Sequence, residues 1–178
     1  SGKKDLIKIC NAKVINIPSP SFTHMNKKKL NNKIDVLKII AVGRLSRDKG
    51  YTIIIKALSK LKINHFSMKI LGDGPEKNNL KKMIKSYNLE SKIKLIGFKK
   101  NTKKYYKEAN LFINASLFEG FPNAVVEAIS YCVPVICSNC KGGAHEILLN
   151  NKGGDFFQSG NPRSLSEKIS LFYKNPKL

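Results

Sequence analysis

Short apolar runs alternate with segments of helical spacing through most of the chain, and this alternation limits the fold more than any other feature. The apolar runs that predict strands are residues 37–42, 68–71, 93–96, 111–114, 134–137 and 154–157. The segments with helical spacing are residues 51–61, 75–87, 102–108, 122–131 and 162–173. Strands that alternate with helices form βαβ units with right-handed crossovers. Because the strands are apolar at nearly every position, we expect an α/β fold, a Rossmann-like parallel sheet with helices on both faces.

The 178 residues suffice for one domain with a sizeable core, and a hydrophobic content of 42% fits a folded protein. A further strand is predicted at residues 13–17, and the Pro-, Asn- and Lys-rich residues 18–36 predict a connecting loop. The first residues, Ser1 to Asp5, lack the apolar core of a secretory signal, and no apolar run reaches the length of a membrane span. We therefore expect a single cytoplasmic domain over residues 1–178, whose beginning looks like a cut end.

The net charge is +21, from 33 basic and 12 acidic residues. Only three of the basic residues are arginines, Arg44, Arg47 and Arg163, and the others are lysines spread along the chain. Proteins that read nucleic acids usually gather Arg and aromatic residues on one face, so we expect no nucleic-acid partner. An anionic membrane surface would attract such a lysine-rich protein, whereas a general bias toward Lys and Asn would give the same composition without any partner.

The cysteines do not follow the spacing of a metal site. Cys137 and Cys140 have C-x-x-C spacing, but no second pair and no His pair follows at zinc-finger distance. Cys132 and Cys137 lie in or beside an apolar run, where a free thiol packs as a small hydrophobic group. We therefore expect reduced thiols in a cytosolic protein, and no metal ion.

Each predicted strand ends in a polar or Gly-rich loop, and the carboxyl ends of parallel strands share one edge of a sheet. The loops that would meet there contain Gly43, Arg44 and Lys49; Gly72 to Pro75; Gly97 and Phe98; Glu119 to Pro122; and Gly142 and Gly143. Cations neutralise phosphates, carboxylates accept hydrogen bonds from hydroxyls, and glycines let the backbone approach a ligand. The sequence therefore predicts a site for a ligand with phosphates, hydroxyls and a flat ring. Glycine after a strand is also ordinary turn chemistry, and Gly72 to Pro75 alone would fit a turn.

The stretch from Asn114 to Ala128 carries the most chemical information. It predicts the end of a buried strand, a tight loop and the start of a helix, a junction at which such folds bind ligands. Glu119 lies in the loop and Glu127 in the helix, with seven residues between them. An unpaired glutamate is costly to bury in an apolar helix, so Glu127 must be paired, exposed or functional.

Taken together, these loops resemble the donor-binding domain of the GT-B glycosyltransferases, in particular the retaining glycosyltransferase family 4, or group 1. The resemblance spans about residues 38–173 and rests on motifs that occur in the family's order. They are Val42-Gly43-Arg44-Leu45 with Lys49-Gly50, Leu71-Gly72-Asp73-Gly74-Pro75, Gly97-Phe98, Phe118-Glu119-Gly120-Phe121-Pro122 with Glu127-Ala128, Pro134-Val135-Ile136, and Gly142-Gly143 with Glu146. The resemblance implies retaining transfer of a hexosyl or N-acetylhexosaminyl group from a nucleotide-diphosphate sugar, with a UDP-sugar favoured. The implied acceptor is a glycan or a lipid-linked sugar in cell-surface polysaccharide synthesis.

The resemblance also implies which residues take part in the reaction. Arg44 and Lys49 would bind the donor's diphosphate and stabilise the leaving nucleoside diphosphate, and Glu119 would hold hydroxyls of the transferred sugar. Charge develops on the departing diphosphate, so cations placed there lower the barrier. No Asp-x-Asp occurs in the chain. We therefore expect Arg44 and Lys49 to take the place of a metal ion, with no cofactor.

The other implied contacts hold the donor. The implied donor-binding residues are Gly43, Gly72, Gly97, Phe98, Gly120, Phe121, Pro122, Asn123 and Glu127. Backbone N–H groups of Gly120, Phe121 and Asn123 would contact the sugar or phosphate. The carboxylate of Glu127 would bind the ribose hydroxyls, and the backbone at Gly97 and Phe98 would hold the base. Residues 72–75 would shape the pocket rather than react.

Two departures from the family pattern limit what the resemblance implies. His145 stands where a proline usually precedes Glu146, and we expect it to be an exposed loop histidine, with a donor or acceptor contact as the alternative. GT-B enzymes also have an N-terminal acceptor-binding domain, which this chain lacks; residues 1–36 resemble the crossing between the domains and its lead-in loop. The implied protein is thus part of a longer enzyme, inactive alone, with contact at the inner membrane face left open.

Two other functions stay open at this point. A nucleotide-sugar epimerase would share the architecture but relies on other catalytic residues, and the Phe118 to Pro122 motif with Glu127 favours transfer. A basic module without enzymatic activity would bind nucleic acid or acidic membranes, and steep salt dependence without nucleotide affinity would distinguish it.

Overall fold

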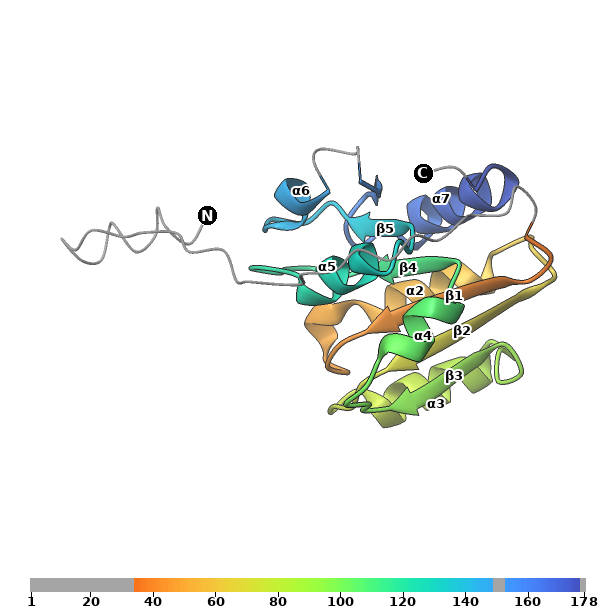
Figure 1. Cartoon of the computed structure of the whole chain (residues 1–178). Coiled ribbons are helices and arrows are strands. Elements are labelled where there is room, and N and C mark those ends of the chain that lie inside the picture. The colour runs from red at the N-terminus through yellow and green to blue at the C-terminus, as the bar shows by residue number, and fades with distance from the viewer. Residues whose placement is uncertain (1–33, 149–152, 177–178) are drawn as a thin grey trace, which may run out of the picture.

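A computed structural model describes residues 34–148 and 153–176, which form a six-stranded sheet in which all strand pairs are parallel (Figure 1). The strands are β1 (Leu37–Val42), β2 (Phe66–Leu71), β3 (Ile93–Gly97), β4 (Leu111–Asn114), β5 (Val135–Ser138) and β6 (Asp155–Phe157). The helices are the 3-10 turn η1 (Arg47–Lys49), α2 (Tyr51–Ser59), α3 (Lys77–Ser86), α4 (Lys103–Glu108), α5 (Asn123–Ser130), α6 (Ala144–Ile147) and α7 (Pro162–Lys174). The predicted α/β architecture is confirmed.

Helices cover both faces of the sheet because successive side chains of a strand point to opposite faces. In β1, Ile39 packs into a core with α2, α3 and α7, whereas its neighbour Ile40 packs into a second core with α4, α5 and α6. Both side chains are almost completely buried, at 2% and 1% exposure. This two-sided burial explains the continuous apolar runs in the sequence.

The strand order is β3-β2-β1-β4-β5-β6. Strands β2 and β3 are thus added on one side of β1, and β4 to β6 on the other side. From β1 the chain builds outward to β3 and then returns to the other side of β1, where Ile40 lies opposite Phe112 of β4. The loops that leave two such strands diverge and open a crevice at their carboxyl ends. The loops after β1 and β4 contain Arg44, Lys49 and Glu119, so the topology places these residues at the crevice.

Two helix boundaries differ from the sequence prediction by two residues, and the other predicted helix ends agree within one residue. Helix α2 ends at Ser59, two residues before Leu61, where the prediction placed its end. Helix α3 begins at Lys77 instead of Pro75. The reason is tertiary, because the N–H of Glu76 donates to the carbonyl of Leu45 in the β1 loop at 2.9 Å. The predicted strand at 13–17 and nearly all of the 1–36 lead-in lie outside the described residues.

The turns after β1 and β2 touch through their backbones. A Cβ placed on Gly72, where φ is +141°, would lie 1.8 Å from the carbonyl oxygen of Gly43. Only glycine fits such a position, because of both the positive φ and the contact. Gly72 thus brings the β2 turn against Gly43, and its role in shaping a donor pocket stays a prediction.

Candidate functional site

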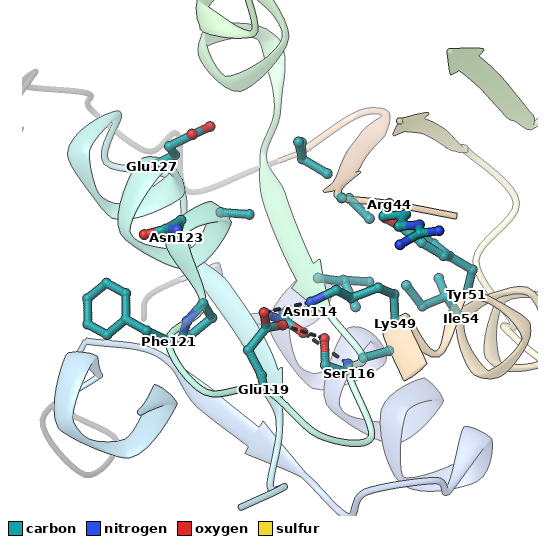
Figure 2. A pocket seen from close by; sticks show the side chains of 17 residues that line it. Arg44, Lys49, Tyr51, Ile54, Asn114, Ser116, Glu119, Phe121, Asn123 and Glu127 are labelled. Carbon is teal, nitrogen blue, oxygen red and sulfur yellow. Dashed lines mark hydrogen bonds and ion pairs between the residues drawn. The ribbon is translucent and has the colours of Figure 1, made fainter. Parts of the chain in front are cut away.

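A cavity of about 280 Å³ opens at the crevice between the carboxyl ends of β1 and β4 (Figure 2). Its polar lining side chains are Arg44, Lys49, Tyr51, Asn114, Ser116, Glu119, Asn123 and Glu127. The β1 loop and α2 supply one side of the cavity, and the β4 loop and α5 supply the other. Residues that are far apart in the sequence, including both glutamates and both predicted cations, therefore meet in one place.

The most tightly connected group in the cavity is an ion pair that the sequence did not predict. The Nζ of Lys49 lies 2.6 Å from Oε1 of Glu119, and the hydroxyl of Ser116 donates to Oε2 of the same carboxylate at 2.6 Å. The lysine and glutamate side chains are 25% and 16% exposed. Each oxygen of Glu119 thus has a short, charge-assisted or hydroxyl hydrogen bond in a place largely withdrawn from water.

The loop that carries Glu119 is held from several sides. The N–H of Ser116 donates to Oδ1 of Asn114 at 2.9 Å, and the N–H of Leu117 donates to the Asp48 carbonyl at 2.7 Å. A Cβ on Gly142 would lie 1.6 Å from the Glu119 carbonyl oxygen, so the loop after β5 backs against Glu119. The carboxylate is therefore positioned by elements on both sides of the crevice.

Tyr51 lines the same cavity and was also missed by the sequence prediction. Its side chain is 4% exposed, and burial, followed by the negative charge of Glu119, raises the pKa of its phenol above the usual value. Tyr51 therefore remains a neutral phenol on the cavity wall. Its hydroxyl would lie 3.1 Å from a Cβ on Gly43, so the ring closes the space beside the β1 turn.

A second hollow, of about 560 Å³, adjoins the first and shares four lining residues with it: Val42, Gly43, Arg44 and Glu127. Its other lining residues are Leu71, Gly72, Asp73, Phe98, Lys99, Lys100 and Thr102. Arg44 and Glu127 thus stand on the wall common to both spaces. Arg44 is exposed, and among the residues that the structure describes none forms a salt bridge with it. Its charge is available to an anion that enters either space.

Glu127 is half-buried in α5 and lines both spaces; in Figure 2 its carboxylate points away from Glu119 and Lys49. The hydroxyl of Thr102 lies 3.5 Å from its Oε2, at the limit of a hydrogen bond. Burial first, and then the charge of Glu127, raises the pKa of the neighbouring Tyr106 phenol. The sequence left Glu127 as paired, exposed or functional, and the structure shows a partly exposed carboxylate that faces a cavity, with the Thr102 hydroxyl and the Tyr106 phenol beside it.

The residues that were predicted to contact the donor through their backbones do not all line a cavity. Phe121, Pro122 and Asn123 line the first cavity, and the N–H of Asn123 already donates to the Phe121 carbonyl at 3.0 Å. Gly120 lies behind them, where its carbonyl accepts from the N–H of Gly143. Gly97, with φ of +79°, is not a lining residue of either space, but it precedes Phe98, which is 74% exposed at the second hollow.

The expectation for His145 is wrong. The residue lies in α6 and is only partly exposed. Its ring stacks on Phe156 of β6 with centroids 4.2 Å apart, and its Nε2 lies 2.8 Å from Oδ1 of Asn139. Because Phe156 of β6 packs against the imidazole ring, His145 has a structural role in joining α6 to the sheet. It lines neither of the two cavities.

Within the described ranges, no group of three or more His, Cys, Asp or Glu side chains is placed to hold a metal ion. The cavity groups that could hold a ligand are instead two cations, two carboxylates and several neutral donors. Such a set suits a ligand that carries both negative charge and hydroxyl groups.

Sequence comparison identifies relatives of the chain. Residues 23–178 match the family described as "Glycosyl transferases group 1". Over 140 residues the chain is 34% identical to N-acetylgalactosamine-N,N'-diacetylbacillosaminyl-diphospho-undecaprenol 4-alpha-N-acetylgalactosaminyltransferase of Campylobacter jejuni, covering 79% of this chain and 38% of the relative. It is 32% identical to the amylovoran biosynthesis glycosyltransferase AmsD of Erwinia amylovora, covering 78% of this chain and 40% of that protein. The chain therefore spans less than half the length of these relatives.

Solved structures share the same sheet. A glycosyltransferase from Rickettsia africae superposes with a TM-score of 0.71 at 28% identity, covering 78% of this chain and 38% of that one. Anabaena Alr3699/HepE in complex with UDP superposes with a TM-score of 0.74 at 24% identity, covering 80% of this chain and 40% of that one. At the latter identity the likeness concerns the fold alone.

Proposed function

The chain belongs to the group 1 glycosyl transferases, and from that membership we propose that it is the donor-binding domain of a retaining hexosyl- or N-acetylhexosaminyltransferase. The observation that carries this proposal is the wall shared by the two cavities. A nucleotide-diphosphate sugar has a nucleoside at one end, a sugar at the other and a diphosphate between. Two adjoining spaces with an exposed arginine and a carboxylate at their junction match that order.

In this assignment the smaller cavity holds the sugar and the phosphate attached to it. Glu119 accepts hydrogen bonds from sugar hydroxyls, while Lys49 and Arg44 contact the diphosphate. The departing diphosphate gains negative charge as the glycosidic bond of the donor breaks. Cations that are already in place stabilise this charge without reorganisation, in a site partly closed to water. Arg44 and Lys49 would supply the positive charge that a metal ion supplies in other transferases.

The larger hollow then holds the nucleoside. Glu127, on the shared wall, would accept hydrogen bonds from the ribose hydroxyls, and the exposed Phe98 would lie beside the base. A nucleoside diphosphate with uracil is the first ligand to test, because a protein of the same fold is described in complex with UDP. The polar groups of the hollow are consistent with other bases too, so GDP and ADP belong in the same test.

The acceptor would be a glycan or a lipid-linked sugar, bound largely by an acceptor domain that the described residues do not include. A relative named for transfer to a diphospho-undecaprenol-linked sugar supports a lipid-linked acceptor in cell-surface polysaccharide synthesis. None of the helices described here is long and apolar enough to cross a membrane. The large excess of lysines instead supports contact with an anionic membrane surface at its cytoplasmic face.

Calorimetry with UDP, GDP and ADP tests the proposal. We expect one of them to bind, and Glu127→Ala to weaken that binding about tenfold or more, because a hydrogen bond to a carboxylate contributes about 1.5–3 kcal/mol. Glu90→Ala, which changes an exposed glutamate between α3 and β3, is the matched control and should bind as the parent chain does. A folded chain that binds none of the three nucleotides would refute the proposal.

A further inference from the structure

A third hollow, of about 520 Å³, lies over α4 and adjoins the proposed nucleoside hollow at Lys99. It is lined by Lys99, Asn101, Lys103, Lys104, Tyr105 and Lys107, which we call the lysine face. All four lysines are exposed, and of the described residues that line this hollow none is acidic. Four ammonium groups are therefore gathered around one concave surface.

Glu108 of α4 adjoins this face, and its carboxylate pairs with Lys69 of β2 at 2.7 Å. Lys69 first, and more weakly Lys104 of the face itself, lowers the pKa of this carboxyl. The one negative charge of Glu108 is smaller than the positive charge of the four lysines. The ammonium groups of Lys104 and Lys69 lie 5.0 and 5.5 Å from the centroid of the Tyr105 ring. An aromatic face attracts cations, so the 9%-exposed Tyr105 helps to keep two lysines close together despite their mutual repulsion.

The residue types indicate the kind of partner. Lysine is a strongly hydrated point charge on a flexible stem, which suits many similar phosphate groups at loosely defined positions. Arginine, which binds phosphates and bases in a fixed two-pronged geometry, is not among the lining residues. Lysines gathered on one surface suit the headgroup region of an anionic bilayer, where each ammonium group meets many similar phosphate groups.

We infer that the lysine face docks the protein on a bilayer of anionic phospholipids. Lys99 lines both this hollow and the larger hollow with Phe98 and Glu127, so a docked protein would hold the rim of that hollow close to the lipid surface. The lipid contact does not depend on the donor chemistry; only its use, to meet a lipid-linked acceptor, rests on the proposed function.

Cosedimentation of the 178-residue chain with vesicles tests this inference without any nucleotide. The vesicles are either an equimolar mixture of phosphatidylglycerol and phosphatidylcholine or phosphatidylcholine alone. The test variant is Lys103→Gln with Lys104→Gln. The control is Lys81→Gln with Lys82→Gln, which removes the same charge from two exposed lysines of α3 on the opposite side of the sheet. Thermal unfolding confirms that both variants are folded.

We expect binding to the anionic vesicles only, weaker at physiological salt than at low salt. Each lysine near an anionic surface strengthens partitioning about fivefold, so the test variant should lose about twenty-fivefold and the control distinctly less. Three results would overturn the inference: no binding of the parent chain to anionic vesicles, an equal loss in both variants, or tighter binding to a single-stranded oligonucleotide than to the vesicles. Because nucleotide is absent, failure of the donor proposal would leave each of these results unchanged.

Discussion

The ion pair between Lys49 and Glu119 gives a prediction whose sign is not obvious. If Lys49 must contact the donor's diphosphate, Glu119 competes with that diphosphate for the same ammonium group, since Nζ of Lys49 lies 2.6 Å from Oε1 of Glu119. Glu119→Gln removes the competing charge but keeps an oxygen that can still accept from Ser116. We therefore expect this variant to bind UDP more tightly than the parent chain does.

The size of the effect follows from the environment of the pair. Exposed ion pairs contribute about 0–1 kcal/mol, whereas a hydrogen bond to a charged group contributes about 1.5–3 kcal/mol where water is excluded. Side-chain exposures of 25% and 16% place this pair between those cases. About 1 kcal/mol is a reasonable value, and it corresponds to about a fivefold gain in UDP affinity.

The response to a UDP-sugar should be different. The variant gains the same contact between Lys49 and the diphosphate, but it loses the charge-assisted hydrogen bonds of Glu119 to the sugar hydroxyls. The ratio of UDP-sugar affinity to UDP affinity should therefore fall, and calorimetry with the two ligands measures this ratio directly. Glu167→Gln is the matched control, because it neutralises a glutamate in an exposed ion pair with Arg163 on α7. A lower UDP affinity in Glu119→Gln, or an unchanged one, would show that the pair does not compete with the diphosphate.

Three further predictions test the surroundings of the site. Gly72→Ala would place a Cβ 1.8 Å from the Gly43 carbonyl oxygen and should lower the free energy of unfolding by about 3 kcal/mol or more, as measured in urea. Gly120→Ala, whose Cβ would point into open space, is the control and should change this free energy little. Similar stabilities of the two variants would contradict the tight turn. Gly142→Ala would push against the Glu119 carbonyl, so UDP-sugar affinity should fall more than UDP affinity, and a wild-type ratio in calorimetry would count against this backing role. Burial raises the pKa of the Cys137 thiol to about 12, so this thiol should stay protonated and react slowly with iodoacetamide at mildly alkaline pH. Mass spectrometry measures the rate of labelling, and a rate as high as that of the urea-unfolded chain would disprove this protection.

The sequence predicted the sheet well because each strand is a separate local signal. The bounds of β1 (Leu37–Val42) and β4 (Leu111–Asn114) agree with the prediction, since each apolar run is bounded by polar or turn-forming residues. The start of α3 was misplaced because the signal at Pro75 is local, while the contact of Glu76 with Leu45 is not.

The candidate site could be predicted by residue type but not by pairing. Arg44, Lys49 and Glu119 line the first cavity, as predicted from their position after strands that share one edge of the sheet, and Glu127 of α5 lines it too. The ion pair of Lys49 with Glu119 joins residues 70 positions apart, and no local pattern indicates it. Tyr51 occupies a position in α2 that fits its apolar periodicity, so its role on the cavity wall was hidden by its place in the core. Ser116, three residues before Glu119, was the one missed residue with a local signal, because a hydroxyl at that spacing can reach a side chain in the same loop.

The arrangement of the site also indicates which of its parts must move. Glu119 lies in a loop held by Asn114, by η1 and by the Gly142 backbone, so the carboxylate is the fixed member of the pair. Lys49 ends a flexible four-carbon stem, so its ammonium group can swing between Glu119 and a diphosphate with little change in the fold. Under the proposed assignment, a donor sugar that occupies the hydrogen-bonding capacity of Glu119 would weaken its hold on Lys49 and free the ammonium for the diphosphate. Once the sugar had been transferred, the carboxylate would bind Lys49 again. The same pair that would resist the binding of free nucleotide would therefore favour the release of the nucleotide product.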